Sequence, residues 1–549
     1  MAVGGFTLTC KFWVMTRLSI GNHEKTQPLF FCEDVNRIYI SRQACTQLNI
    51  LPESFPYPMD LLPPSVLYHT PLSQCCSIQT SHQDHLPIRP SKIPFQPLPE
   101  NIPKLKKYLL DQFYTTAFNK GPPFPAMDSL AVHIHLKEAY TPYACHQPIN
   151  VAKHWEEDVK QQLEDDVKNG IIEAIPIGEP VIWCARMHIV PKKFGKPRRV
   201  VDFQHLNKFC LRETHHCPSP FSLATQVPAN TYKTILDAVD GYHAIKLDEE
   251  SKNLTTFITQ WGRYRYCRLP QGFLASGDAY TRRYDDLIKD VPRKIKIIDD
   301  TLLYDQDIES AFFHTWDYLS LCAQKGIVIN QSKFQFCQLN VDFAGLSLNS
   351  SGVCPSSKII SAIRNFPHPT DLSSARTWFG LVNQVAWAYA NHHVMKPFRD
   401  LVKPSSTFFW DSHMDSLFLQ SKDKLIAQVY EGVKSFDTCR QTLLQTDWSS
   451  DGIGYLLLQK YCDCDIESAP TCCQDGWRLV FAGSRFLKGA ESRYSPTEGE
   501  ALAVAWALEH ARAYTLGCNN LIVSTDHKPL MGILNDRELC SIKTLVLVK

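Results

Sequence analysis

The sequence lacks long apolar runs and has almost no excess of charge. No hydrophobic stretch reaches the roughly 20 residues that a membrane-spanning helix needs. The N-terminal segment carries Lys11 and Arg17 among its apolar residues, which breaks the apolar core expected of a secretory signal. The formal net charge is +1, so any affinity for nucleic acid has to come from local basic patches.

Cysteine, in contrast, is plentiful. The chain has 20 cysteines, which would suggest disulfides in a secreted protein. Without a signal segment, a reducing intracellular compartment with mostly buried free thiols is the simpler expectation. The length of 549 residues and the 44% hydrophobic content predict three or four domains at about 150 residues each.

The clearest change in composition lies early in the chain. Prolines cluster between positions 52 and 103, and because proline fixes φ and lacks an N–H, we expect no regular helix or central strand there and interpret the stretch as a linker. After position 150 apolar residues recur at helical spacing, and Gly170 can end that helix. The residues of this apolar stripe are Trp155, Val159, Leu163 and Val167.

Two adjacent acids, Asp299 and Asp300, stand between short β-prone runs in "KIKIIDDTLLY". Hydrophobic stretches on both sides of a two-residue turn indicate a β-hairpin. Paired carboxylates are also ligands for hard cations. The pair alone does not decide between a turn and a metal site.

Three further segments carry residues suited to phosphate chemistry. In "KTILDAVDGYHAIKLD" Asp237 ends an apolar run, although an acid there is also a common cap or turn residue. In "RLPQGF" a Pro-Gln-Gly turn precedes a helix that we expect to be capped by Ser276 or Asp278. In "PKKFGKPRRVV" cations surround a glycine turn, which suits a triphosphate, a template backbone or merely a solvated hairpin. These cations are Lys192, Lys193, Lys196, Arg198 and Arg199.

In this order, "RRVVDFQHLN", "LDAVDGYHAI", "RLPQGF" and "IIDD" resemble the successive motifs of a reverse transcriptase, and "VDFAGLSL" resembles its primer grip. The family that the chain resembles most is the pol polyprotein of gypsy-type LTR retrotransposons (Metaviridae), over roughly 151–348. The resemblance implies an α+β, multidomain chain with a right-hand polymerase of fingers, palm and thumb. It also implies that the acid pair is both a hairpin and a metal site.

The resemblance implies roles for individual residues. Asp237, Asp299 and Asp300, called the palm acids below, would bind two Mg²⁺ ions, or Mn²⁺, for nucleotidyl transfer. Tyr242 matches a steric gate against the ribose 2′-hydroxyl, and Ile297 departs from the aromatic residue that many relatives carry. The nucleotide-binding set would be Lys192, Lys193, Arg198, Asp240, Tyr242 and Gln271, and the primer grip Phe343, Ala344 and Gly345.

A second set of acids follows in the last part of the chain. Asp447 lies in a predicted strand, Glu500 at the start of a strong helix and Asp526 at a strand end; these are called the nuclease acids below. Thr497 with Glu500 also fits a capping box. The order resembles ribonuclease H of the same elements and implies two-metal hydrolysis of the RNA in an RNA–DNA hybrid. The segment after Asp526 is shorter than in the family, so we expect a C-terminally truncated ribonuclease H-like α/β domain that cleaves poorly.

The resemblance divides the chain into five predicted parts. The segment at 31–56 resembles the tail of a retroelement aspartic protease, but no Asp-Thr-Gly or Asp-Ser-Gly occurs, so no protease activity is expected. The parts are a protease-tail remnant at 1–58, a Pro-rich linker and lead-in at 59–150, fingers and palm at 151–350, thumb or connection at 351–435 and the ribonuclease H-like domain at 436–549.

Four cysteines gather in "YCDCDIESAPTCC". They can bind zinc, although Cys-x-Cys and adjacent cysteines are not the usual structural spacing. An insertion loop with reduced thiols is the alternative. The cysteines are Cys462, Cys464, Cys472 and Cys473.

The expected function is therefore an intracellular RNA-directed DNA polymerase of an LTR retrotransposon, in a cytoplasmic particle, in the nucleus or in both. Its partners would be an RNA template, a DNA primer or RNA–DNA hybrid and deoxynucleoside triphosphates, with no membrane. The alternative is a decayed or host-adopted fragment that binds nucleic acid without catalysis. Retention of all three palm acids favours the polymerase.

Overall fold

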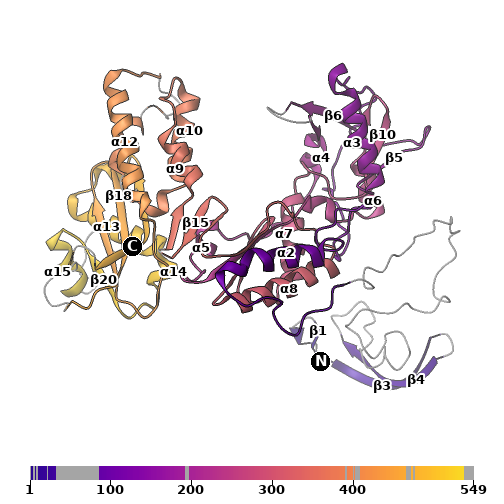
Figure 1. Cartoon of the computed structure of the whole chain (residues 1–549), viewed down its shortest axis with the longest axis horizontal. Helices are drawn as coiled ribbons and strands as arrows, with labels where there is room; N and C mark the ends of the chain where they lie inside the picture. Colours follow the sequence, from indigo (N-terminus) through magenta and orange to yellow (C-terminus); the bar gives the residue numbers. More distant parts are fainter. Residues whose placement is uncertain are drawn as a thin grey trace. The chain divides into compact units, whose positions relative to one another are not determined.

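A computed structural model of the chain separates into two compact units, Met1–Thr80 and Ser81–Lys549. Figure 1 labels some of their helices and strands. In the first unit the described residues form two antiparallel hairpins, β1 (Ala2–Val3) with β2 (Phe6–Thr7) and β3 (Cys10–Ile20) with β4 (His23–Cys32). In the second unit the structure describes residues 86–191, 197–350, 352–389, 392–399, 401, 408–464, 472–473 and 476–536. Most of the segment interpreted as a protease tail lies outside the described residues.

The part of the predicted lead-in around 102–113 belongs to a hydrophobic core. Helix α2 (Ile102–Phe113) has Pro103 in its first turn, where the missing N–H costs no helical hydrogen bond. The expectation of no regular helix up to position 103 is therefore wrong at its end. Phe113 is fully buried, and its ring lies 4.9 Å from that of Trp316 in α8 (Ile308–Gln324).

A five-stranded sheet with the strand order β5-β10-β9-β6-β7 follows. Helix α3 (Glu156–Lys168) buries Val159 and Leu163 but leaves Val167 exposed, so the predicted helix is confirmed while its apolar stripe ends one turn early. Gly170 has a φ of +66° just past the helix, as expected at a C-terminus. The strands are β5 (Ile172–Ala174), β6 (Ala185–Val190), β7 (Arg198–Val201), β9 (Phe257–Thr259) and β10 (Gly262–Tyr266).

A four-stranded antiparallel sheet, called the β8 sheet below, carries the palm acids. Its order is β11-β12-β8-β13. Helix α8 packs on β8 and β12, and the Tyr284 hydroxyl of α7 (Ser276–Ile288) lies 3.0 Å from that of Tyr318 in α8. The strands are β8 (Tyr232–Asp237), β11 (Lys294–Ile297), β12 (Asp300–Asp305) and β13 (Gln335–Gln338).

Short helices complete this region. They are α4 (Gln204–Phe209), α5 (Pro220–Ala224), η5 (Gly241–Ala244) and α6 (Glu249–Leu254).

A small sheet and four helices form a second core. The sheet order is β14-β15-β16, and the rings of Trp378 and Phe418 meet edge to face at 4.8 Å, both buried. The elements are β14 (Val341–Phe343), β15 (Leu346–Asn349), β16 (Gly352–Pro355), α9 (Ser357–Arg364), α10 (Leu372–Asn383), α11 (His392–Arg399) and α12 (Ser412–Tyr430).

The last sheet, called the β17 sheet below, has the order β19-β18-β17-β20. Strand β20 runs parallel to β17, whereas the other pairs are antiparallel. Helix α13 packs on β17 and β18. The elements are β17 (Thr442–Trp448), β18 (Gly452–Lys460), β19 (Trp477–Phe486), α13 (Pro496–His510), α14 (Arg512–Thr515), β20 (Leu521–Ser524) and α15 (Lys528–Asp536).

Helix-capping predictions based on spacing alone were wrong at two helices. In α13 the capping box is formed by Ser495 and Glu498, not by Thr497 and Glu500. Helix α7 has no side-chain cap. The Ser276 hydroxyl instead donates to the carbonyl of Pro270 at 2.7 Å.

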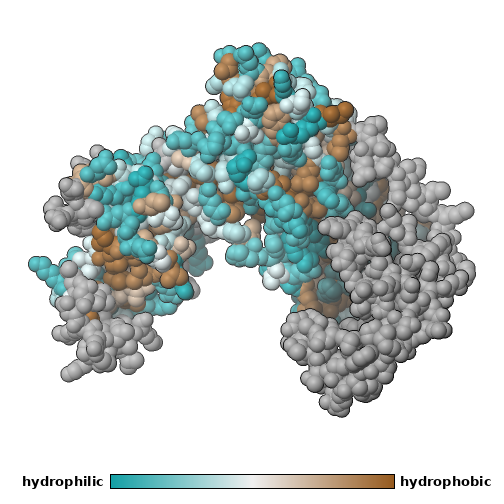
Figure 2. Space-filling view, turned by 90° about the horizontal axis from the view of Figure 1, so that it is seen from below, coloured by the Kyte–Doolittle hydropathy of each residue, from teal (hydrophilic) through white to brown (hydrophobic). Residues whose placement is uncertain are grey.

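The mixture of helices and sheets confirms the α+β prediction. Figure 2 shows a face on which hydrophobic patches are interspersed among hydrophilic residues. Across the described part of the chain, every helix is too short or too polar to cross a membrane.

Candidate active sites

The two adjacent acids lie where an antiparallel hairpin turns. Ile297 pairs with Asp300 across β11 and β12, and Ile298 takes a φ of +54° in the turn. Asp300 in turn pairs with Asp237 at the end of β8. The Ala238 N–H, one residue on, donates to the carbonyl of Asp299 at 2.9 Å. Strand register therefore brings the three palm acids to one end of the β8 sheet, and the Asp-Asp pair is a hairpin turn beside a third acid.

Burial raises the free energy of ionising two of the palm acids. Asp237 is 8% exposed. Burial raises the pKa of Asp299, and the charge of Asp237 adds to the rise. The pKa of Asp300 rises to about 6 through burial and through its hydrogen bond and charge interaction with Asp237. Such clustered carboxylates are stabilised in their ionised form by a cation.

A lysine that the sequence analysis did not identify supplies positive charge here. Lys333 Nζ donates to Asp237 Oδ2 at 2.8 Å, and the Asn330 N–H donates to the Asp237 carbonyl at 2.8 Å. The Lys333 side chain is 62% exposed, so it can leave without unpacking the core. No periodic pattern marks this residue, which stands in an irregular turn between α8 and β13.

Tyr242, the predicted steric gate, lies next to the palm acids. Burial raises its pKa, and the charge of Asp299 contributes to the rise. Its ring meets that of Tyr280 edge to face at 5.5 Å. A Cβ on Gly241 would stand 2.3 Å from the Tyr280 ring, so the backbone before Tyr242 can approach this ring only because residue 241 is glycine. Asp240, exposed, takes a left-handed φ of +45° just before.

The predicted nucleotide-pocket residues Arg198 and Gln271 contact each other. Arg198 Nη2 donates to Gln271 Oε1 at 2.6 Å, and both residues are exposed. Lys192 and Lys193 lie outside the described residues.

Asn207, not singled out from the sequence, holds the turn that carries Gln271. Its Nδ2 donates to the Gly272 carbonyl and its Oδ1 accepts from the Leu274 N–H, both at 2.9 Å. An amide that bridges backbone groups in this way fixes a loop. The residue stands in the quoted "RRVVDFQHLN" segment, which was its available signal.

The predicted primer grip is a tight hairpin between β14 and β15. Phe343 pairs with Leu346, and the two turn residues Ala344 and Gly345 have φ angles of +50° and +83°. Two positive φ angles define the type I′ turn that suits the twist of a two-residue hairpin. Phe343 is buried, whereas Ala344 and Gly345 are exposed. The contact of this turn with a primer stays a prediction.

The β17 sheet brings the nuclease acids closer together than the β8 sheet brings the palm acids. Asp447 lies on β17, Asp526 follows β20, and the two strands are parallel neighbours. Glu500, on α13, is 5% exposed. The carboxylates of the three acids lie within 4.8 Å of one another. Burial and the charges of Asp526 and Asp447 raise the pKa of Glu500 to about 7, so a cation would stabilise the ionised group.

Residues next to the nuclease acids are closely packed. A Cβ on Gly499 would lie 2.1 Å from the ring of Trp448, so the glycine lets Trp448, which follows Asp447, pack directly on α13 beside Glu500. Near Asp526, Thr497 Oγ1 and His527 Nε2 are 2.8 Å apart. This contact replaces the capping role expected of Thr497.

Within the described ranges, two groups of three or more His, Cys, Asp or Glu side chains place one ligand atom each within 4.8 Å of the others. These are the nuclease acids and the four cysteines. The palm acids share a strand end but are less tightly gathered.

Comparison with protein families identifies two domains. Residues 190–348 match the reverse transcriptase (RNA-dependent DNA polymerase) family, and residues 437–545 match the RNase H-like domain found in reverse transcriptase. The chain therefore contains a region that matches reverse transcriptases, followed by one that matches RNase H-like domains.

Relatives define the kind of element. The chain is 27% identical to the Retrovirus-related Pol polyprotein from transposon opus of Drosophila melanogaster, over 69% of this chain and 38% of the relative. It is 25% identical to the corresponding polyprotein from transposon gypsy of the same organism, over 69% of this chain and 36% of the relative. Both relatives are transposon Pol polyproteins, which confirms the resemblance predicted from the sequence, and the chain spans little more than a third of each.

Solved structures share the fold. A foamy viral protease-reverse transcriptase in complex with double-stranded DNA matches with a TM-score of 0.68 and 17% identity, over 97% of this chain and 86% of that one. The same viral protein in complex with an RNA/DNA hybrid matches with a TM-score of 0.64 and 18% identity, over 81% of this chain and 60% of that one. The fold expected from the sequence is confirmed.

Proposed function

We propose that the chain is an RNA-directed DNA polymerase that adds deoxynucleotides to a primer 3′-hydroxyl. The observation that carries the proposal is the register of the β8 sheet, which pairs Asp300 with Asp237 and holds Asp299 in the adjoining turn. Two divalent ions bound by such acids activate the hydroxyl and neutralise the leaving pyrophosphate. Mg²⁺ fits these hard oxygen ligands and is the proposed ion, with Mn²⁺ as a substitute.

The neighbouring residues suit the handling of a nucleotide. Arg198 presents a guanidinium beside Gln271 and can contact the triphosphate with paired N–H donors. Tyr242 lies near Asp299 and contacts the Tyr280 ring, and its bulk would meet the sugar. Lys192, Lys193 and Asp240 complete the proposed nucleotide-binding set. Phe343, Ala344 and Gly345 are the proposed primer grip.

The nuclease acids support a second activity, hydrolysis of RNA within an RNA–DNA hybrid. Asp447, Glu500 and Asp526 offer three carboxylates at metal-ligand spacing, and two-metal hydrolysis needs such a set. Copying RNA into DNA leaves a hybrid as product, so the second site would act on what the first one makes.

The proposed partners are an RNA template, a DNA primer or RNA–DNA hybrid, and deoxynucleoside triphosphates. Structures of the same fold hold double-stranded DNA and an RNA/DNA hybrid, which supports this class of ligand. With a net charge of only +1, binding would depend on local cations and should weaken steeply as salt rises. The predicted domain boundaries at 58, 150, 350 and 435 remain part of the proposal, as does an intracellular location.

One experiment with two readouts tests both activities. Asp237→Asn should lower primer extension on an RNA template by at least about 100-fold, because a ligand that stabilises charge in the transition state is lost. The same variant should cleave a labelled hybrid normally. Asp447→Asn should show the reverse pattern. Asp290→Asn, at an exposed acid beyond α7, is the matched control and should retain both activities.

Each outcome has a clear meaning. Extension by Asp237→Asn within tenfold of the unmodified chain would contradict the palm assignment, and normal cleavage by Asp447→Asn would contradict the nuclease assignment. An unmodified chain that binds template-primer but performs neither reaction would instead support nucleic-acid binding without catalysis.

A further inference from the structure

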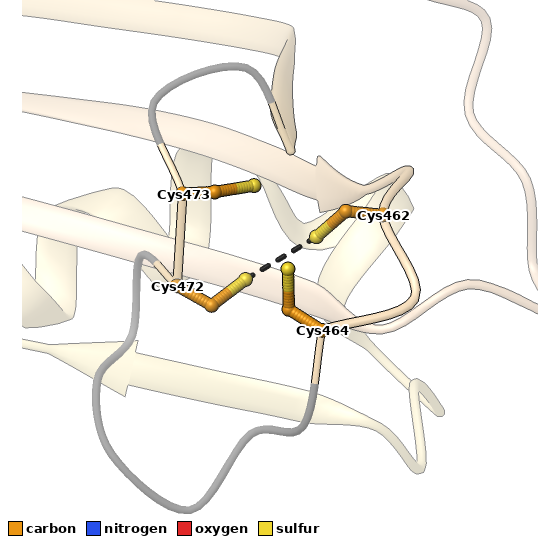
Figure 3. Close-up of side chains that lie close together, drawn as sticks. All are labelled: Cys462, Cys464, Cys472 and Cys473. Carbon is orange, nitrogen blue, oxygen red and sulfur yellow. Dashed lines mark hydrogen bonds between the residues drawn. The ribbon is translucent and has the colours of Figure 1, made fainter.

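Four cysteines converge in the loop between β18 and β19. Cys462 and Cys464 lie on one side of the loop and Cys472 and Cys473 on the other. Their Sγ atoms all lie within 4.8 Å of one another, and Figure 3 shows the four side chains pointing toward a common centre. Neither the polymerase nor the nuclease chemistry uses them.

The spacing of the sulfurs fits a tetrahedral metal ion. A Zn–S distance of about 2.3 Å places sulfurs at the corners of a tetrahedron about 3.8 Å apart. Here the Sγ atoms of Cys462 and Cys472 are 3.2 Å apart, and the other pairs are no further apart than 4.8 Å. Small movements of the side chains reach the ideal value. The unusual spacing along the sequence is therefore no obstacle, since two short pairs meet across a hairpin.

The backbone around the cysteines leaves room for this arrangement. Lys460 pairs with Trp477 at the base of the loop, and the Tyr461 N–H donates to the Gly476 carbonyl at 2.6 Å. A Cβ on Gly476 would stand 2.4 Å from Sγ of both Cys462 and Cys473. Any other residue at 476 would push into the sulfurs.

Two cations lie near the loop, together with Asp463 within it and with Asp437, which pairs with Arg440 at 3.1 Å. Four thiolates around Zn²⁺ carry a net charge of −2, which is stabilised by nearby cations. The Lys460 ammonium donates a hydrogen bond to the Cys464 carbonyl. The Arg440 guanidinium lies 4.1 Å from the centroid of the Tyr461 ring.

We propose that Cys462, Cys464, Cys472 and Cys473 bind one Zn²⁺ ion in a structural site that closes the β18–β19 loop. Four protein ligands leave no open coordination position for a substrate. The site also stands away from the nuclease acids. Asp447 pairs with Gly454 near the start of β18, whereas the cysteines follow its last residue, Lys460. The ion would stabilise the hairpin, and the proposal does not depend on either catalytic activity.

The test measures metal in the full chain, purified under reducing conditions with zinc in the growth medium. We expect one zinc per chain by mass spectrometry of the metal. Cys464→Ser and Cys472→Ser should each lose most of it, while Cys217→Ser, at an exposed cysteine outside the loop, should retain it. Replacing the metal with Co²⁺ should give the intense visible bands of tetrahedral thiolate ligation, absent from both loop variants.

Several results would overturn the proposal. They are zinc below about a tenth of an equivalent in the well-folded, reduced chain, zinc that survives both loop substitutions, or an octahedral cobalt spectrum. Alkylation and peptide mapping test the rival chemistry, and a Cys462–Cys472 disulfide in the chain as isolated from cells would also refute it. Circular dichroism separates lost metal binding from lost folding, and Cys464→His, which keeps a zinc ligand, should recover zinc if the variants fail only at the metal.

Discussion

Replacing Gly499 by alanine should damage the nuclease site while sparing the polymerase. The new Cβ would stand 2.1 Å from the Trp448 ring, whereas ordinary contacts begin near 3.4 Å. The ring or helix α13 therefore has to move by about 1.3 Å, the difference between these distances. Trp448 follows Asp447 and Gly499 precedes Glu500, so the movement separates two of the three nuclease acids.

The size of the effect follows from that displacement. A misplacement of about 1 Å in a catalytic group costs on the order of 100-fold in rate, so hybrid cleavage should fall by about this factor. Overpacking should also cost about 1–3 kcal/mol of stability, partly offset by up to about 1 kcal/mol because alanine favours a helix.

The assay compares single-turnover cleavage of a labelled RNA–DNA hybrid with primer extension by the same preparation. Extension should be unchanged and serves as an internal control for folding. Gly532→Ala, in α15 of the same domain, meets no atom within 4 Å and should cleave within about twofold of the unmodified chain. If Gly499→Ala cleaves as well as Gly532→Ala, the close packing of Trp448 does not position these acids.

Two further predictions concern sugar choice and pH. Tyr242→Ala should open space for a 2′-hydroxyl and raise ribonucleotide incorporation relative to deoxyribonucleotide by at least about tenfold, while Tyr242→Phe should not; paired extension assays measure the ratio, and an unchanged ratio would place the gate elsewhere. Because the pKa of Glu500 is raised to about 7 and a cation binds its ionised form, the Mg²⁺ concentration that half-saturates hybrid cleavage should fall about tenfold between pH 6 and pH 8. Glu509→Gln, at an exposed glutamate on the same helix, should show the same fall, and a flat profile in the unmodified chain would contradict the role of Glu500.

Local patterns predicted the acids and their strands well. Asp237 ends a buried strand, and the two acids at 299–300 interrupt alternating apolar runs, so their elements follow from short stretches of sequence. The nuclease acids were likewise placed correctly on strand, helix and strand. The exact capping residues were not, because Ser495, Thr497 and Ser276 all fit a cap by type, and only their tertiary partners decide which hydroxyl bonds where.

Partners brought together by tertiary folding left no local signal. Lys333 pairs with Asp237 although 96 positions separate them. A lysine in a surface turn has the same appearance whether it is solvated or paired. The contact between Gly499 and Trp448 is similar, since a glycine inside a helix normally only weakens it. Long-range contacts of this kind depend on strand order, which the sequence patterns did not establish.

The parallel pairing of β17 with β20 bears on the order in which the two active sites can form during synthesis. The palm acids come from neighbouring antiparallel strands and are all present once residue 300 has been made. The nuclease site has to wait for residues 521–526, because β20 and Asp526 come after α13 although they lie beside β17. The chain emerges from the ribosome N-terminus first. Pairing β20 with β17 then requires closing the long loop between these two strands, which is slow. The palm acids can therefore come together while the chain is still being made, before the nuclease acids can.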